Sequence, residues 1–145
     1  MGDLTKDIHS KFENNRVKAL LNIIYTANWI TSYQNEFFKP FGISPQQYNI
    51  LRILKGAETP LKVQTIKDRM LERSPNATRL MDKLCAKQYI ERCPSADDRR
   101  VVKIAITDTG KAFLESIPNN FNKDLLKHLS EEDAGQLSGL LDKMR

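Results

Sequence analysis

Residues 74–87 hold the side chains whose types and spacing are most informative about chemistry. Their apolar residues form one stripe at helical spacing, so the opposite face carries polar and basic groups. An arginine can bridge O6 and N7 of guanine, and an asparagine can bridge N6 and N7 of adenine. We therefore expect Asn76 and Arg79 to contact bases, with Thr78 beside them meeting a phosphate or a thymine methyl group. On an isolated helix these groups would more often be a solvated face, so the interpretation depends on the neighbouring elements.

A second group of side chains is expected to contact phosphates, and so to set affinity rather than sequence. The free N–H groups at the start of a helix can bind a phosphate oxygen, and a serine there adds a hydroxyl group. The expected phosphate contacts are Lys67, Arg73, Ser74, Lys83 and Lys87.

The distribution of charge supports a polyanionic partner. Of 145 residues, 23 are Lys or Arg and 18 are Asp or Glu, which gives a net charge of +5. Residues 60–103 contain 11 of the basic and 6 of the acidic side chains, a difference of 5, so this segment accounts for the whole net charge. A basic segment between neutral flanks is typical of a nucleic-acid-binding module.

Other function classes find little support. No nucleophile elbow, phosphate-binding loop or metal-ligand pair is present, so we predict no catalytic residue, no cofactor and no metal. His9 and His128 are far apart in sequence, and Cys85 and Cys93 make neither a disulfide framework nor a metal quartet. No apolar run approaches the roughly 18 residues of a membrane span. We expect a cytoplasmic protein with no membrane partner.

The elements expected around residues 74–87 are mainly helical. Ser44-Pro45 with Gln47 is a typical helix start with a capping box, and Ser130 with Asp133 is another. The expected elements are a long helix from about Leu4 to Phe38, helices over residues 44–56, 61–71 and 74–87, strands over 89–93 and 101–106, a helix after Thr107 that Pro118 breaks, and a last helix after Ser130. Helix, turn, helix and a hairpin with a basic tip is the order of a winged helix-turn-helix.

The hairpin carries a resemblance to a known family. Asp98, Arg100, five further residues and Ile106-Thr107 resemble the wing signature of MarR-family transcriptional regulators, Asp-x-Arg, five residues and Leu-Thr. The resemblance implies that Arg99 and Arg100 enter the minor groove while Asp98 braces the tip, for which we expect an ion pair. A narrow minor groove concentrates negative potential, which agrees with an arginine there. Gln88 departs from the glycine usual after the recognition helix, and would be strained at a positive φ.

The resemblance also implies an architecture: one MarR-type domain over residues 1–145. Residues 44–107 would form the winged helix, and residues 1–40 and 108–145 would supply helices that dimerise with a second copy. Two such copies would present two recognition helices to a pseudo-palindromic operator.

Many relatives are released from DNA by small aromatic or phenolic anions. Tyr25, Trp29 and Tyr33 are spaced four residues apart, and they either line an effector crevice or belong to the core or dimer interface. The redox mechanism of some relatives uses a cysteine near the N-terminal helices, which this chain lacks there, so it is not carried over.

The function predicted from the sequence is a homodimeric, sequence-specific DNA-binding regulator that acts as a ligand-released repressor on double-stranded DNA. The alternative is a ligand- or protein-binding module on the same fold without DNA recognition.

Overall fold

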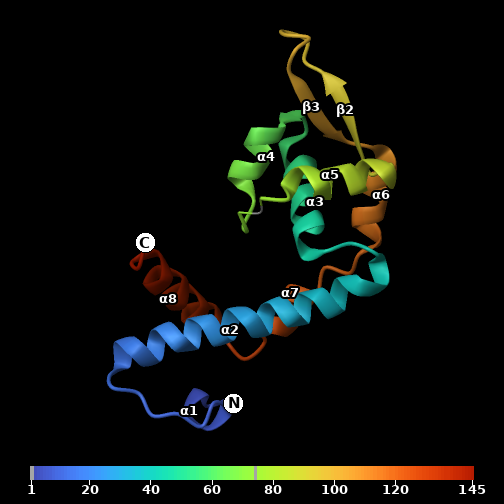
Figure 1. Ribbon diagram of the computed structural model, residues 1–145. Coiled ribbons are helices and arrows are strands. Elements are labelled where there is room, and N and C mark those ends of the chain that lie inside the picture. The colour runs from blue at the N-terminus through green and yellow to red at the C-terminus, as the bar shows by residue number, and fades with distance from the viewer. Residues whose placement is uncertain (1, 74) are drawn as a thin grey trace.

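The computed structural model describes residues 2–73 and 75–145. The chain is mainly helical with one small antiparallel sheet, as expected (Figure 1). Its elements are α1 (Leu4–Asp7), α2 (Asn15–Phe38), the 3-10 helix η1 (Lys39–Phe41), α3 (Pro45–Ala57), β1 (Leu61–Lys62), α4 (Val63–Arg69), α5 (Ala77–Ala86), β2 (Ile90–Pro94), β3 (Val102–Ile106), α6 (Asp108–Ser116), α7 (Phe121–Leu125) and α8 (Glu131–Asp142).

The core lies between α3, α4, α5 and the base of the sheet. Apolar side chains from each of these elements are almost completely buried and pack together; among them are Ile50, Leu51, Leu54, Ile66, Met81, Leu84, Ile90 and Ile104. An aromatic cluster at the C-terminal end of α2 joins this core, with the Phe37 and Phe121 rings stacked at 4.7 Å. The C-terminal end of the long helix α2 is therefore fixed to residues 44–107, which we call the winged unit.

The sheet has one strand more than the hairpin expected from the sequence. Its order is β1-β3-β2, with both pairs antiparallel. The two residues of β1 were expected to be helical, but Leu61 pairs with Ile104 and Lys62 with Lys103. A two-residue strand depends on its partner strand rather than on its own periodicity, which is why the sequence pattern missed it.

Three predicted helix starts are confirmed. The Ser44 hydroxyl accepts from the Gln47 N–H at 3.1 Å while the Gln47 side chain accepts from the Ser44 N–H, which completes a capping box. Ser130 caps α8 in the same way, and the Thr107 hydroxyl caps α6 by accepting from the Gly110 N–H. These motifs are local, so the sequence alone can specify them.

Several predicted helix bounds are wrong. The segment from Leu4 to Phe38 is not one helix, because a left-handed His9 and irregular residues separate α1 from α2, which Asn14 caps. The last residue of α3 is Ala57, one beyond the predicted end at Gly56, and the C-cap residue Glu58 is left-handed. The helix α5 begins at Ala77 rather than at residue 74, with Asn76 at its N-cap position. The expected cap, Ser74, lies outside the described residues.

The C-terminus of α5 ends in a Schellman motif. Gln88 has a φ of 62°, in the left-handed region where a residue other than glycine is strained, and its N–H donates to the Cys85 carbonyl at 2.9 Å. The next N–H, of Tyr89, donates to the Leu84 carbonyl at 3.1 Å. This pattern is the usual way to stop a helix with a left-handed residue, normally a glycine. The turn leads directly into β2.

Large apolar side chains remain exposed on α2 and α8, at the end of the molecule away from the hairpin (Figure 1). The exposed set on these helices and their flanks is Leu20, Leu21, Ile24, Tyr25, Trp29, Leu137, Leu140 and Met144. Leu137 and Leu140 of α8, and Met144 just after it, are therefore not buried within the single chain. Exposed apolar surface of this extent is typical of an interface.

Candidate nucleic-acid interface

The helix α5 has one buried face and one exposed face, as its sequence pattern predicted. Ala77, Met81 and Leu84 are almost completely buried against the core. Thr78, Arg79, Asp82 and Lys83 are exposed on the other side. The helix therefore presents two basic side chains and one hydroxyl group to solvent, and a single carboxylate among them.

The predicted base contacts lie at the start of this helix. Asn76 occupies the N-cap position, and its side chain makes no capping hydrogen bond to the first turn. Thr78 and Arg79 follow in the first turn of α5, both exposed. The N-terminal turns of a recognition helix are those that meet base edges in winged and related helix-turn-helix proteins.

The predicted phosphate contacts divide into two groups. Lys67, half-buried on α4, and Arg73, exposed in the loop before α5, line one shallow cavity together. Lys83 is exposed on α5 itself, and Ser74 lies outside the described residues. The loop that carries Arg73 is held to α3, because the Asn49 side chain accepts from the Leu71 N–H at 3.0 Å. Lys67, Arg73 and Lys83 remain candidates for phosphate contacts.

Lys87 is exposed, but its ammonium group also has a protein partner. Its ammonium group donates to the Gly42 carbonyl at 2.6 Å, between α5 and the turn that precedes α3. The sequence placed Lys87 on the exposed face because the lysine follows Lys83 by one helical turn. In the structure Lys87 is the C-cap residue of α5, where the helix ends and the spacing rule no longer applies. The phosphate contact predicted for Lys87 stays a prediction, for a side chain that already has the Gly42 carbonyl as an acceptor.

The wing tip is a compact turn whose backbone is held by local hydrogen bonds. Asp98 Oδ1 accepts from the Arg100 N–H at 2.9 Å, and the Asp98 carbonyl accepts from the Val101 N–H at 3.0 Å. The sequence led us to expect an ion pair from Asp98, whereas the contact found is to the backbone. Arg99 and Arg100 are both exposed at the tip. Figure 1 shows the hairpin of β2 and β3 projecting away from the helices.

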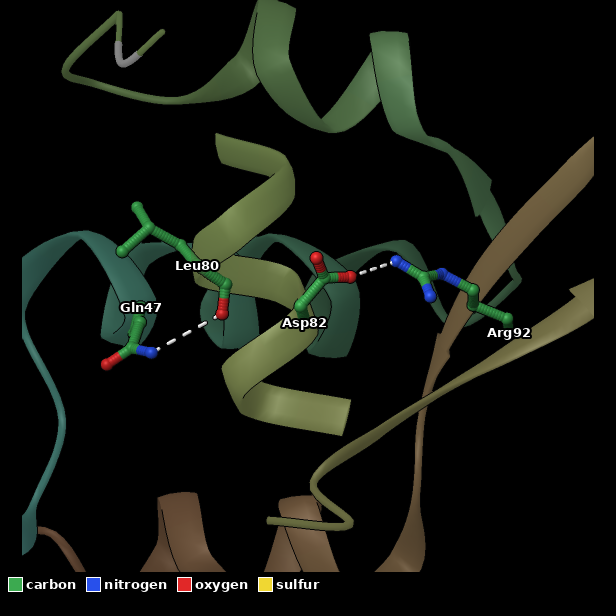
Figure 2. A network of polar contacts seen from close by, with 4 residues as sticks. All are labelled: Gln47, Leu80, Asp82 and Arg92. Atoms are coloured by element: carbon green, nitrogen blue, oxygen red, sulfur yellow. Dashed lines mark hydrogen bonds and ion pairs between the residues drawn. The ribbon is translucent and has the colours of Figure 1, made fainter. Parts of the chain in front are cut away.

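Two polar contacts that were not predicted from the sequence hold α5 from either side (Figure 2). On one side, the buried Gln47 of α3 donates to the Leu80 carbonyl at 3.3 Å while its oxygen caps its own helix. On the other, Arg92 of β2 makes an ion pair with Asp82. Neither contact has a sequence signal, because each joins residues ten or more positions apart.

The thiol of Cys85 lies beside this ion pair. Burial raises the pKa of the Cys85 thiol; the charge of Arg92 partly offsets this rise, and that of Asp82 adds to it. A thiol with a raised pKa is mostly protonated at neutral pH, and the thiolate is the reactive form. We therefore expect Cys85 to react slowly at neutral pH, with a pKa that depends on both members of the Asp82–Arg92 pair.

Two of the three aromatic side chains proposed for an effector crevice lie together. Tyr25 and Trp29 are exposed on α2 and line a cavity that α1 covers in part, whereas Tyr33 packs against the core. The Trp29 and Tyr33 rings are 6.5 Å apart.

None of the described helices is long and apolar enough to cross a membrane.

The fold and the basic face together define a winged helix-turn-helix protein. A sequence model of the MarR family matches residues 41–101. The chain is 31% identical over 120 residues to the HTH-type transcriptional regulator MhqR of Bacillus subtilis, covering 79% of this chain and 81% of that protein. It is 28% identical over 116 residues to the multiple antibiotic resistance protein MarR of Escherichia coli, covering 76% and 78%.

A solved structure shows the same fold over the whole length. A cysteine-to-serine variant of E. coli MarR, complexed with operator DNA, covers 99% of both chains with a TM-score of 0.75 at 23% identity. The chain belongs to the MarR family of transcriptional regulators, and it is a DNA-binding regulator, as the sequence predicted. The alternative of a binding module without DNA recognition finds no support.

Proposed function

We propose that this protein represses transcription by binding a pseudo-palindromic operator as a homodimer. In each protomer α5 enters the major groove with Asn76, Thr78 and Arg79 toward the bases. Arg99 and Arg100 of the wing reach the adjacent minor groove. The observation that carries the proposal is the arrangement of exposed basic groups on α5 and on the tip of a hairpin whose base shares one apolar core with α5.

Lys67, Arg73 and Lys83 supply contacts to phosphates in this proposal. Each phosphate neutralised by a basic side chain releases condensed counterions, so the logarithm of affinity falls with the logarithm of salt concentration. The slope decreases by roughly 0.9 for each contact removed, and a homodimer loses both copies of a contact in one substitution. Lys83→Ala is therefore expected to reduce the slope by about 2 while lowering affinity for all sequences.

The homodimer is supported by the apolar side chains exposed on α2 and α8. Burial of this surface against a second copy removes apolar area from water, the main driving force for association. Sedimentation equilibrium is expected to give twice the chain mass of 16.7 kDa. Leu140→Glu on α8 places a charge on a side chain that is 63% exposed in the single chain, so it is expected to weaken the dimer without unfolding the winged unit.

Fluorescence anisotropy with the DNA upstream of its own gene, measured across salt concentrations, tests the proposed function. We expect Arg79→Ala to lose about 1–3 kcal/mol of discrimination per half-site and Arg100→Ala to lose affinity at the flanking minor groove. Lys123→Ala, on α7 and away from the wing, is the matched control and is expected to bind like the wild type. A salt-independent affinity that neither Arg79 nor Arg100 affects would contradict the proposal.

Release by a small aromatic or phenolic anion extends the proposal. Tyr25 and Trp29 offer exposed ring surface beside α1. Titration of the protein–DNA complex with a panel of phenolic acids is expected to lower the anisotropy, and Trp29 fluorescence reports whether the ligand binds near this ring. Quenching of Trp29 fluorescence without release of the DNA would show that the ligand binds but does not regulate DNA binding.

A further inference from the structure

The ion pair between Asp82 and Arg92 joins the two DNA-contacting elements of the protomer. Asp82 lies on the exposed face of α5, three residues after Arg79. Arg92 lies in β2, the first strand of the wing, and its guanidinium group reaches across to the Asp82 carboxylate (Figure 2). Both side chains are about half exposed, at 54% and 49%. The pair therefore lies on the surface, between helix and wing.

The base of the wing packs in the same core as α5, through Ile90 and Ile104, but its outer part has less to fix its direction. β2 is an edge strand, paired only with β3. The third strand β1 reaches only as far as Ile104 and Lys103, and beyond them the hairpin continues as a two-stranded ribbon. Two-stranded ribbons twist more freely than larger sheets and are marginally stable alone. Arg92 pairs with Ile104, so the ion pair acts within the part of the wing that β1 supports, one residue pair before that support ends.

We propose that Arg92 and Asp82 are positioning residues for operator recognition. The pair sets the angle between α5 and the wing, so that the helix and the wing tip of one protomer meet the major and minor grooves together. The inference rests on the proposed DNA-binding mode. Ordering the wing before binding reduces the entropy lost on association, which is the general benefit of preorganisation.

A purely electrostatic role gives the opposite prediction for Asp82. A carboxylate on a face that meets phosphates repels DNA, so its removal alone should strengthen binding. If Arg92 were simply another phosphate contact, releasing it from Asp82 would strengthen binding further. If the pair positions the wing, removal of either partner weakens binding. The sign of the change at Asp82 therefore separates the two roles.

The experiment compares Asp82→Asn, Arg92→Gln and the double variant, all as full-length dimers. Each is titrated by anisotropy with operator DNA and with a nonspecific duplex at one salt concentration. Glu91→Gln is the matched control, because it removes one negative charge as Asp82→Asn does. Glu91 directly precedes Arg92 in β2, so its side chain faces the other side of the sheet. Thermal unfolding of every variant checks that the exposed substitutions leave the fold intact.

Both single variants are expected to weaken operator binding. An exposed ion pair contributes about threefold per protomer, and about tenfold for a dimer that uses both copies. The double variant should bind no more weakly than either single variant, and Arg92→Lys should recover most of the loss. Nonspecific binding by Asp82→Asn should be unchanged or slightly tighter, since only the specific complex needs both grooves in register.

Two results would overturn the inference. Operator binding by Asp82→Asn that equals or exceeds that of the wild type would assign Arg92 to a direct phosphate contact. Additive losses in the double variant would show that the two residues act separately. Wild-type protein and Arg79→Ala are measured alongside: if the wild type itself ignores the operator, the proposed function fails and the positioning role fails with it. If Arg79→Ala weakens binding while Asp82→Asn does not, only the positioning role is lost.

Discussion

A methyl group added at Gly110 is expected to lower the free energy of unfolding, because Gly110 packs closely against the chain at the base of the wing. It lies in the first turn of α6 and is buried against the chain that leaves α5. A Cβ atom built there would lie 2.9 Å from Cγ1 of Ile106 and from the carbonyl carbon of Tyr89, and closer still to the Tyr89 oxygen. That oxygen cannot turn away freely, because it accepts from the Thr107 N–H at 3.0 Å.

The size of the effect follows from two opposing contributions. Gly→Ala inside a helix stabilises it by about 1 kcal/mol through backbone entropy. Overpacking typically costs up to about 3 kcal/mol, and the upper value applies here because the obstacle is backbone rather than a flexible side chain. Gly110→Ala is therefore expected to lower the free energy of unfolding by about 2 kcal/mol net, which corresponds to about 4–8 °C in Tm for a chain of this length.

Urea unfolding followed by far-UV circular dichroism measures this difference. All variants must be compared at one protein concentration, since a dimer gains apparent stability with concentration. Gly56→Ala is the control: it lies near the end of α3, an added Cβ there meets nothing within 4 Å, and it should stabilise by up to about 1 kcal/mol. If Gly110→Ala were as stable as the wild type, the close approach of α6 to Tyr89 would be wrong.

Three further predictions concern the same region. Gln88→Gly should stabilise the protein by up to about 1 kcal/mol in urea unfolding, because the residue has a left-handed φ of 62°; destabilisation would contradict this. Thr107→Val should cost about 1–2 kcal/mol in the same assay, since it loses the cap of α6 and a 2.6 Å hydrogen bond to the Gln88 carbonyl, whereas Thr107→Ser should keep most of both. In a Cys93→Ser background, iodoacetamide should modify Cys85 with a midpoint above the ordinary pKa of 9.0, because burial favours the protonated thiol; Arg92→Gln should raise that midpoint, and a midpoint below 9.0 would refute the assignment.

The sequence predicted the winged unit well because its signals are local. The caps at Ser44 and Thr107 are each specified within four residues, and the apolar stripe of α5 shows which face is exposed. The break between α1 and α2 was missed because no glycine or proline marks it. The exposed basic face of α5 was predicted by periodicity, but its last member, Lys87, lies where periodicity ends.

The contacts between elements could not be predicted from the pattern. Arg92 counted only as one more basic residue of the central segment until β2 placed it beside α5. Gln47 was predicted as a capping residue, and it is one, but its amide also reaches the Leu80 carbonyl from a buried position. Both depend on how separate elements pack, which a single sequence does not encode in its spacing.

The geometry of α2 connects the dimer to the spacing of the DNA half-sites. A helix of 24 residues is about 36 Å long at 1.5 Å per residue. It is fixed to the winged unit by the aromatic cluster at its C-terminal end, while its exposed apolar side chains lie mostly in its N-terminal half. In the proposed dimer, two copies that meet through these halves would have their winged units at opposite ends of the assembly. Half-sites one turn of DNA apart are separated by about 34–36 Å, which is of the same order as the length of α2. In such a dimer a rigid α2 would set the spacing of the two α5 helices, and the ion pair between Asp82 and Arg92 would set the angle between each α5 and its wing.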